Sequence, residues 1–217
     1  MKNIAGKAYA INVFTPIKTR TRWVNDMVMW YAAKGIGPNK GNDLKKLSFI
    51  HFARWVVIPK SAFTHFPGKG QPKEQMNYDY LFFESNFNGT WDQYINAFSD
   101  VLPTGLNIIW FWSIKYPGSV PVTPFKDYII HNQIWTDYYF NATPGAATND
   151  VKAGLHFRDA LASFRAATKD LSDDDFKTAY EQFLTEVQDD LGETGVGPQL
   201  SLRRRSNVKI SRESIDA

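Results

Sequence analysis

Four stretches of the chain are rich in apolar and aromatic residues, with the alternation or the unbroken run that predicts a β-strand. They cover residues 7–15, 48–58, 78–87 and 106–115. Proline closely follows the first, second and fourth stretches. Because proline cannot donate a ladder hydrogen bond, it is expected to end each of these strands.

Two segments between these stretches have the spacing of an amphipathic helix. In residues 19–34, one stripe carries Trp23, Met27, Trp30 and Tyr31. The second segment, 91–102, repeats large apolar residues at helical spacing.

The start of this second helix has the clearest local signals in the chain. Asn88-Gly89 is a turn signal directly after the third strand. Thr90 with Gln93 three residues later fits a capping box, in which each residue satisfies a free backbone N–H of the first turn. The third strand is therefore expected to pass through a tight turn into the second helix.

The order strand–helix–strand–strand–helix–strand over residues 7–116 predicts an α+β fold of the ferredoxin-like, split βαβ type. Such a fold has one antiparallel sheet with two helices on one face. Its other face needs cover, either from the rest of the chain or from a second subunit.

Residues after 116 predict a helical extension. Thr123-Pro124 begins a helix, residues 138–141 form a short edge strand, Thr148 caps a helix that ends near 168, and Ser172 begins another. We therefore expect one domain over residues 1–191, made of the ferredoxin-like unit and added C-terminal helices. Residues 192–217 are polar and glycine-bearing, and predict a flexible basic tail.

Composition narrows the possible classes of protein. A hydrophobic content of 43% over 217 residues is enough for a core and argues against global disorder. The absence of Cys excludes disulfides, thiolate metal sites and cysteine nucleophiles in this chain. No stretch has the pattern of a signal peptide or a membrane span, so a cytoplasmic protein is expected.

The formal charge of +3 is placed unevenly. Arg203, Arg204 and Arg205 lie in the tail, and the body is close to neutral, so nucleic-acid binding is not expected. The three arginines could recruit a protein partner, contact phosphates or anionic lipid, or only aid solubility.

Three phrases of the sequence resemble a known group of proteins: HFARWVV at 51–57, FESNFNGTW at 83–91 and KDYIIHNQ at 126–133. They are similar to a bacterial family of uncharacterised ferredoxin-like domains, related to the dimeric α/β-barrel superfamily. That superfamily includes antibiotic-biosynthesis monooxygenases, chlorite dismutases and dye-decolourising peroxidases. The resemblance covers roughly residues 8–165 and implies two sheets packed face to face, within or between chains, around an apolar cavity.

The chain departs from the peroxidase branch of this superfamily. It has no Gly-x-x-Asp-Gly signature, and only Asn86-Phe87-Asn88-Gly89 lies near the corresponding turn. Haem is the cofactor that the resemblance would allow, but the motif assigns no proximal ligand. No cofactor is therefore predicted.

Candidate site residues lie on the second and third strands. Arg54 and Glu84 could meet across the sheet, or His51 could face the same cavity as Glu84. A charged side chain in an aromatic strand is usually paired or functional. A structural ion pair, the polar end of a ligand cavity and simple exposure are the three alternatives.

Histidine supplies the remaining candidate. His131 has Asp127 four residues earlier on the same helical face, which could make an acid–base pair. His65 and His156 have no partner visible in the sequence. No His-x-His or His-x-x-x-His spacing supports a metal site, and none is predicted.

Two functions from different classes remain open. The chain could be a small-molecule-binding domain, with possible oxidoreductase-like chemistry on an apolar ligand. It could also be a non-catalytic assembly or accessory protein that forms homo-oligomers and recruits a partner through its basic tail. The residues do not decide whether it is an enzyme.

Overall fold

A computed structural model of the chain describes residues 3–34, 47–61 and 76–191. The predicted tail over 192–217 lies outside these residues. The described strands are β1 (Ile4–Ala5), β2 (Ala8–Ile17), β3 (Ile50–Ile58), β4 (Asp79–Asn88) and β5 (Gln133–Ile134). The α-helices are α1 (Arg22–Ala33), α3 (Trp91–Val101), α4 (Pro103–Trp110), α5 (Val122–Asn132), α6 (Thr148–Ala167) and α7 (Asp173–Val187).

The strands form one antiparallel sheet in the order β1-β2-β4-β3, and β5 pairs with β2 on the side away from β4. The first, second and third long strands of the chain thus lie in the spatial order first, third, second. This arrangement confirms the predicted α+β class with an antiparallel sheet and is compatible with a ferredoxin-like fold.

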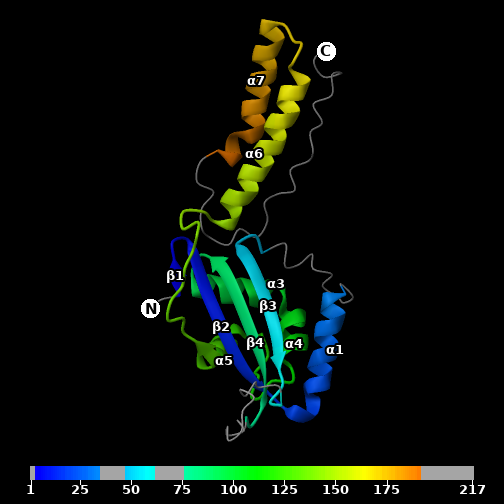
Figure 1. Cartoon of the computed structure of the whole chain (residues 1–217), viewed down its shortest axis with the longest axis vertical. Coiled ribbons are helices and arrows are strands. Elements are labelled where there is room, and N and C mark those ends of the chain that lie inside the picture. The colour runs from blue at the N-terminus through cyan, green and yellow to red at the C-terminus, as the bar shows by residue number, and fades with distance from the viewer. Residues whose placement is uncertain (1–2, 35–46, 62–75, 192–217) are drawn as a thin grey trace, which may run out of the picture.

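The helices α3 and α4 lie behind the sheet in Figure 1, on the face that forms the main core. Alternate residues of the two central strands point to this face: Ile11, Val13 and Ile17 of β2, and Leu81, Phe83 and Phe87 of β4. The ring of Tyr94 on α3 stacks on Phe87 with 3.8 Å between ring centroids. Large aromatic rings therefore fill the space between sheet and helices.

The predicted entry into α3 is confirmed. Thr90 is the N-cap residue, its side chain accepts from Gln93 N at 3.3 Å, and Gln93 Oε1 accepts from Thr90 N at 3.2 Å. Gly89 precedes it with φ +93°, a conformation that glycine adopts without steric cost.

The predicted fourth strand over 106–115 is wrong. Pro103 begins α4 only two residues after α3 ends, and α4 buries Leu106 and Trp110, which are four residues apart. Only an isolated bridge between Ser113 and Ile17 has strand geometry in this region. The beginning of α5 at Val122 agrees with the predicted helix, whereas 138–141 is not a strand; instead β5 pairs with β2 directly after α5.

The stripe predicted on the first helix is present, but it does not face the core. Asn25 is the buried residue of α1, and its Nδ2 donates to Ile109 O of α4 at 3.1 Å. Trp23 and Trp30 are 64% and 54% exposed. Helix α1 lies beyond β3 at the side of the molecule (Figure 1).

Helices α6 and α7 form an antiparallel pair that projects away from the sheet (Figure 1). Phe164, Ala179, Phe183 and Val187 make a small apolar cluster between them, separate from the main core. Ser172 caps α7 by accepting from Asp175 N at 3.3 Å, as predicted. The helix pair thus has little apolar contact with the body, and its position depends on the base of α6.

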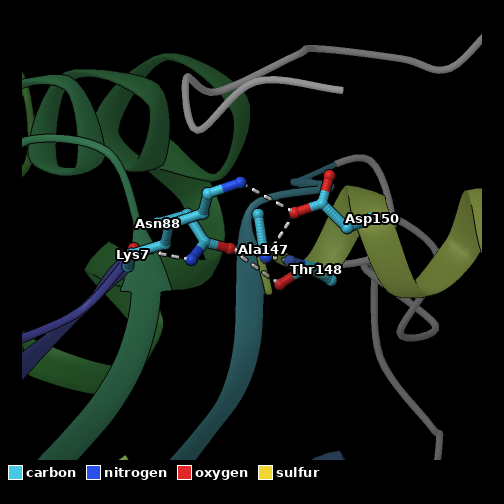
Figure 2. A network of polar contacts seen from close by, with 5 residues as sticks. All are labelled: Lys7, Asn88, Ala147, Thr148 and Asp150. Atoms are coloured by element: carbon cyan, nitrogen blue, oxygen red, sulfur yellow. Dashed lines mark hydrogen bonds and ion pairs between the residues drawn. The ribbon is translucent and has the colours of Figure 1, made fainter. Parts of the chain in front are cut away.

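A polar network at the base of α6 joins three distant segments (Figure 2). Asn88 Oδ1 accepts from Thr148 N at 2.9 Å and Oγ1 at 3.1 Å, while its Nδ2 donates to Lys7 O at 2.8 Å. Asp150 Oδ2 accepts from Ala147 N at 2.7 Å and pairs with Lys7 Nζ at 3.2 Å. Thr148 is therefore not the cap that the sequence predicts: Ala147 is the N-cap residue, and the Thr148 side chain binds Asn88.

Candidate functional site

The open face of the sheet, opposite α3 and α4, is formed by the other alternate residues of the three long strands. It carries Phe14 and Pro16 from β2, Tyr80, Phe82, Glu84 and Asn86 from β4, and Phe52, Arg54, Val56 and Ile58 from β3. Phe52 is 54% exposed and Val56 42%. Three strands spaced about 4.8 Å apart and about nine residues long present a projected area of roughly 400 Å².

Arg54 and Glu84 lie directly opposite each other on this face and form an ion pair. The Arg54 guanidinium also lies over the Phe82 ring, 5.8 Å from its centroid. Of the alternatives left open by the sequence, the cross-strand ion pair is therefore present, and each charge has a partner. A pair with a largely exposed arginine contributes little stability, about 0–1 kcal/mol.

Tyr139 and Asn86 are two further polar residues near Glu84. The Tyr139 hydroxyl donates to Asn86 Oδ1, and burial together with the nearby Glu84 carboxylate raises the pKa of Tyr139. Tyr139 comes from the segment after β5. The centre of the open face is thus polar, and its borders are aromatic.

His51 does not join this group. A bulge between Ile50 and Phe52 interrupts the pairing of β3 with β4 at His51. Partial burial lowers the pKa of the His51 imidazole, and the Asn88 side chain offsets part of that effect. His51 is therefore closer to the network at the base of α6 than to Glu84.

A hollow of about 560 Å³ lies beside α5 and is open to solvent. We call it the α5 hollow. Its apolar lining comes from Pro16, Tyr78, Ile114, Pro117, Pro124 and Tyr128, and its polar lining from Lys115, Asp127, His131 and Asn132. Volumes of this order are typical of small-molecule sites.

His131 lines the hollow in one defined tautomer. Its Nδ1 lies 2.7 Å from the backbone oxygen of Asp127. A carbonyl oxygen can only accept, so Nδ1 carries the proton, and in the neutral ring Nε2 keeps a lone pair. The partner of Nδ1 is the backbone oxygen of Asp127 and not its carboxylate, so this contact orients the ring but is not the acid–base pair expected from the helical spacing.

Lys115 belongs to the polar lining of the hollow and Tyr128 to its apolar lining. Lys115 has φ +58°, a left-handed backbone that costs a non-glycine residue roughly 1–2 kcal/mol. Burial raises the pKa of Tyr128 to about 12, partly offset by the Ser113 and Thr15 hydroxyls, so the phenol stays protonated at neutral pH.

The structure separates the four candidate residues into distinct places. Arg54 and Glu84 pair on the open face, His51 lies near the base of α6, and His131 lines the α5 hollow. Sequence reasoning missed Lys115, because nothing in its neighbours marks a left-handed residue. His156 Nδ1 contacts Asp190 Oδ2 at 2.5 Å in the α6–α7 pair.

His65 and the tail residues Arg203, Arg204 and Arg205 lie outside the described residues. Among the residues that are described, no three His, Asp or Glu side chains gather as a metal site requires. Within 3–34, 47–61 and 76–191, no helix has both the length and the apolar character needed to cross a membrane.

In comparisons with known proteins, no family model matches the chain, and neither a curated protein nor a solved structure matches it. A functional proposal for this chain therefore depends on its own geometry.

Proposed function

We propose that this chain binds a small, flat, largely apolar molecule in the α5 hollow. The observation that carries the proposal is the lining of the hollow, where proline and tyrosine residues lie together with His131, whose Nδ1 contact with Asp127 O leaves the ring lone pair on Nε2. Such walls favour stacking of a flat ring, and a few placed polar groups fix its orientation.

The polar groups suggest the ligand class. His131 Nε2 is an acceptor and calls for a hydroxyl or N–H on the ligand. Lys115 offers an ammonium group, exposed and without an ion pair to any described residue, and calls for a carboxylate or carbonyl. A ring with a donor at one end and an acidic group at the other satisfies both. If the hollow supports a reaction, Nε2 of His131 is the atom that would accept a proton.

Two probes that differ by one hydroxyl test this proposal. We expect the protein to bind 4-hydroxybenzoate about three- to tenfold more tightly than benzoate, the value of one net hydrogen bond. His131→Phe should remove this preference, and Lys115→Gly should weaken both probes because it removes the ammonium group. Ligand-observed NMR titration measures the affinity of each probe for the unaltered chain and for the two variants.

Two controls separate binding from folding. His51→Phe makes the same replacement outside the hollow and should keep the preference. Lys115→Gly should leave the free energy of unfolding unchanged or raise it by up to about 1 kcal/mol, since glycine tolerates the left-handed backbone. An equal preference for the hydroxylated probe in His131→Phe would contradict the proposal.

We also propose, as a second function, that the open face mediates homo-oligomer assembly. The exposure of Phe52 and Val56 on the face opposite the helices supports this. Groups of exposed apolar side chains on one face of a protein often mark interaction sites. Face-to-face packing of two copies would give the two-sheet arrangement of a dimeric α/β-barrel.

The charges of the open face suit a second copy of the same chain. Arg54 and Glu84 supply one charge of each sign near the centre, so a two-fold axis could bring the Arg54 of each copy to the Glu84 of the other. The pair would then remain satisfied on assembly. This favours a non-catalytic role for both residues, because each already has a charged partner.

Phe52→Glu tests the assembly. We expect the unaltered chain to be a dimer at micromolar concentration by light scattering, and Phe52→Glu to be a monomer, because a carboxylate would be desolvated against the apolar partner face. Phe111→Glu is the matched control: Phe111 is 64% exposed on the end of α4 and should leave the mass unchanged. A monomeric unaltered chain would rule out this second function without affecting the first.

A further inference from the structure

The outward stripe of α1 is an apolar feature that neither proposal uses. Trp23, Met27, Trp30 and Tyr31 follow helical spacing, and all four are exposed. The ring of Trp30 packs edge-on against Tyr31, with 5.0 Å between centroids. An unbroken row of two indoles, a thioether and a phenol on one helix face is unusual at a free surface.

The orientation of this stripe is fixed by the opposite side of α1. Asn25 is fully buried and donates to the backbone of α4. Arg22 Nη1 lies 3.8 Å from the buried carboxylate of Asp79 at the start of β4. Turning the stripe inward would remove both contacts and leave the buried carboxylate of Asp79 without its arginine, which is costly.

Positive charge accompanies the stripe. Residues 18–34 contain four basic side chains and one acidic side chain. The acidic residue is Asp26, whose Oδ2 lies 3.6 Å from Arg22 Nε. Lys18, Arg20 and Lys34 are exposed and have no ion pair with a described residue, and Lys34 Nζ lies 5.9 Å from the Trp30 ring centroid.

We propose that α1 lies on an anionic lipid surface, with the stripe in the headgroup region and Lys18, Arg20 and Lys34 against the lipid phosphates. A helix that combines tryptophan and tyrosine on one face with basic residues at its borders has the character of an interfacial helix. Twelve residues give a length of about 18 Å, enough to lie flat on a membrane but not to cross it.

The charge pattern favours lipid over a protein groove. A protein partner would need an acidic rim around an apolar groove, whereas an anionic bilayer supplies both properties at any point of its surface. Each basic residue near such a surface strengthens binding about fivefold at physiological salt, and the effect falls as salt screens it.

Vesicle co-sedimentation of the full chain tests the proposal. We expect binding to phosphatidylcholine vesicles that contain phosphatidylserine, and much weaker binding to phosphatidylcholine alone. Lys18→Ala with Arg20→Ala should weaken binding about 20- to 30-fold. Trp23→Ser with Trp30→Ser should weaken it roughly tenfold or more, because two rings no longer leave water.

Matched controls exclude general effects of charge and tryptophan loss. Lys60→Ala with Lys169→Ala removes two exposed charges elsewhere, and Trp135→Ser removes an exposed indole elsewhere; both should bind vesicles as the unaltered chain does. Circular dichroism should be unchanged in every variant, since all these side chains are exposed.

Three results would overturn the proposal. The first is equal binding to neutral and anionic vesicles, and the second is no vesicle binding at all. The third is a change of native mass in vesicle-free solution caused by Trp23→Ser with Trp30→Ser, because the stripe would then be a protein contact.

Discussion

Replacing Trp110 with alanine is expected to lower the free energy of unfolding by about 3–5 kcal/mol, the range for truncating a fully buried tryptophan. Trp110 is 1% exposed, and its ring packs edge-on against Phe83 and Trp55 at centroid distances of 5.4 and 6.5 Å. Removing it leaves a cavity between α4 and the sheet that these rings cannot fill. Denaturant unfolding followed by circular dichroism measures the loss.

Substitutions at two neighbours of Trp110 test whether this segment is a helix or a strand. Ile108→Ala and Phe111→Ala should each cost less than about 1 kcal/mol, because both side chains are exposed in α4. A strand would place Ile108 on the same face as Trp110, since its side chains repeat every two residues. Equal losses for Ile108→Ala and Trp110→Ala would therefore contradict the helix.

In the same region, hydrophobic periodicity does not distinguish a helix from a strand. Residues 106–115 form an almost unbroken apolar run, and such a run fits a buried strand and a buried helix equally well. Pro103 and Gly105 directly precede this run, and both residue types commonly mark the end of a helix. In the structure Pro103 instead occupies the first position of α4, where its missing N–H has no consequence, and Leu102 serves both as C-cap of α3 and N-cap of α4.

The sheet was more predictable, because two independent signals agree along β4. Its alternation places Leu81, Phe83 and Phe87 on the core face, and the capping box of Thr90 fixes the point where the following helix begins. Register follows from the same alternation, since a slip of one residue would bury Glu84. The Arg54–Glu84 pair could be predicted for this reason.

Local pattern does not predict which face of α1 is exposed, nor which residues line the α5 hollow. The spacing of Trp23 and Trp30 gives a stripe but not the side to which it turns. That side depends on Asn25 and Arg22, whose partners Ile109 and Asp79 lie far along the chain. The hollow likewise joins β2, the segment before β4, and α5, and no local pattern brings these together.

Long-range polar contacts also determine how the α6–α7 pair is held. Asn88 ends β4, yet its side chain binds Lys7 and Thr148, which are 81 and 60 residues away in sequence. Both ends of the amide have partners of the correct type, so its orientation is unique. Because the helix pair has its own small apolar cluster, this network and the adjacent turn at Gly6 set its position relative to the sheet.

Gly6→Ala is the second change for which we expect a large effect, a loss of about 2–4 kcal/mol in the free energy of unfolding. Gly6 has φ +62°, and an added Cβ would lie 2.1 Å from Pro144 O and 2.5 Å from Pro144 Cα. These are backbone atoms that cannot rotate away. The segment before α6 must therefore move, which breaks the hydrogen bond from Lys7 N to Pro144 O, now 2.9 Å. Urea unfolding measures the loss.

Gly145→Ala is the matched control, because it adds the same methyl group one residue after Pro144. A Cβ there would meet no atom within 4 Å, so stability should change by no more than about 0.5 kcal/mol. Amide hydrogen exchange locates the effect of Gly6→Ala: amides at the base of α6 should lose more protection than those of the α4 core around Trp110, whose protection falls only with the global stability. An equal loss of protection at all amides would contradict the view that Gly6 acts by fixing the position of the α6–α7 pair relative to the sheet.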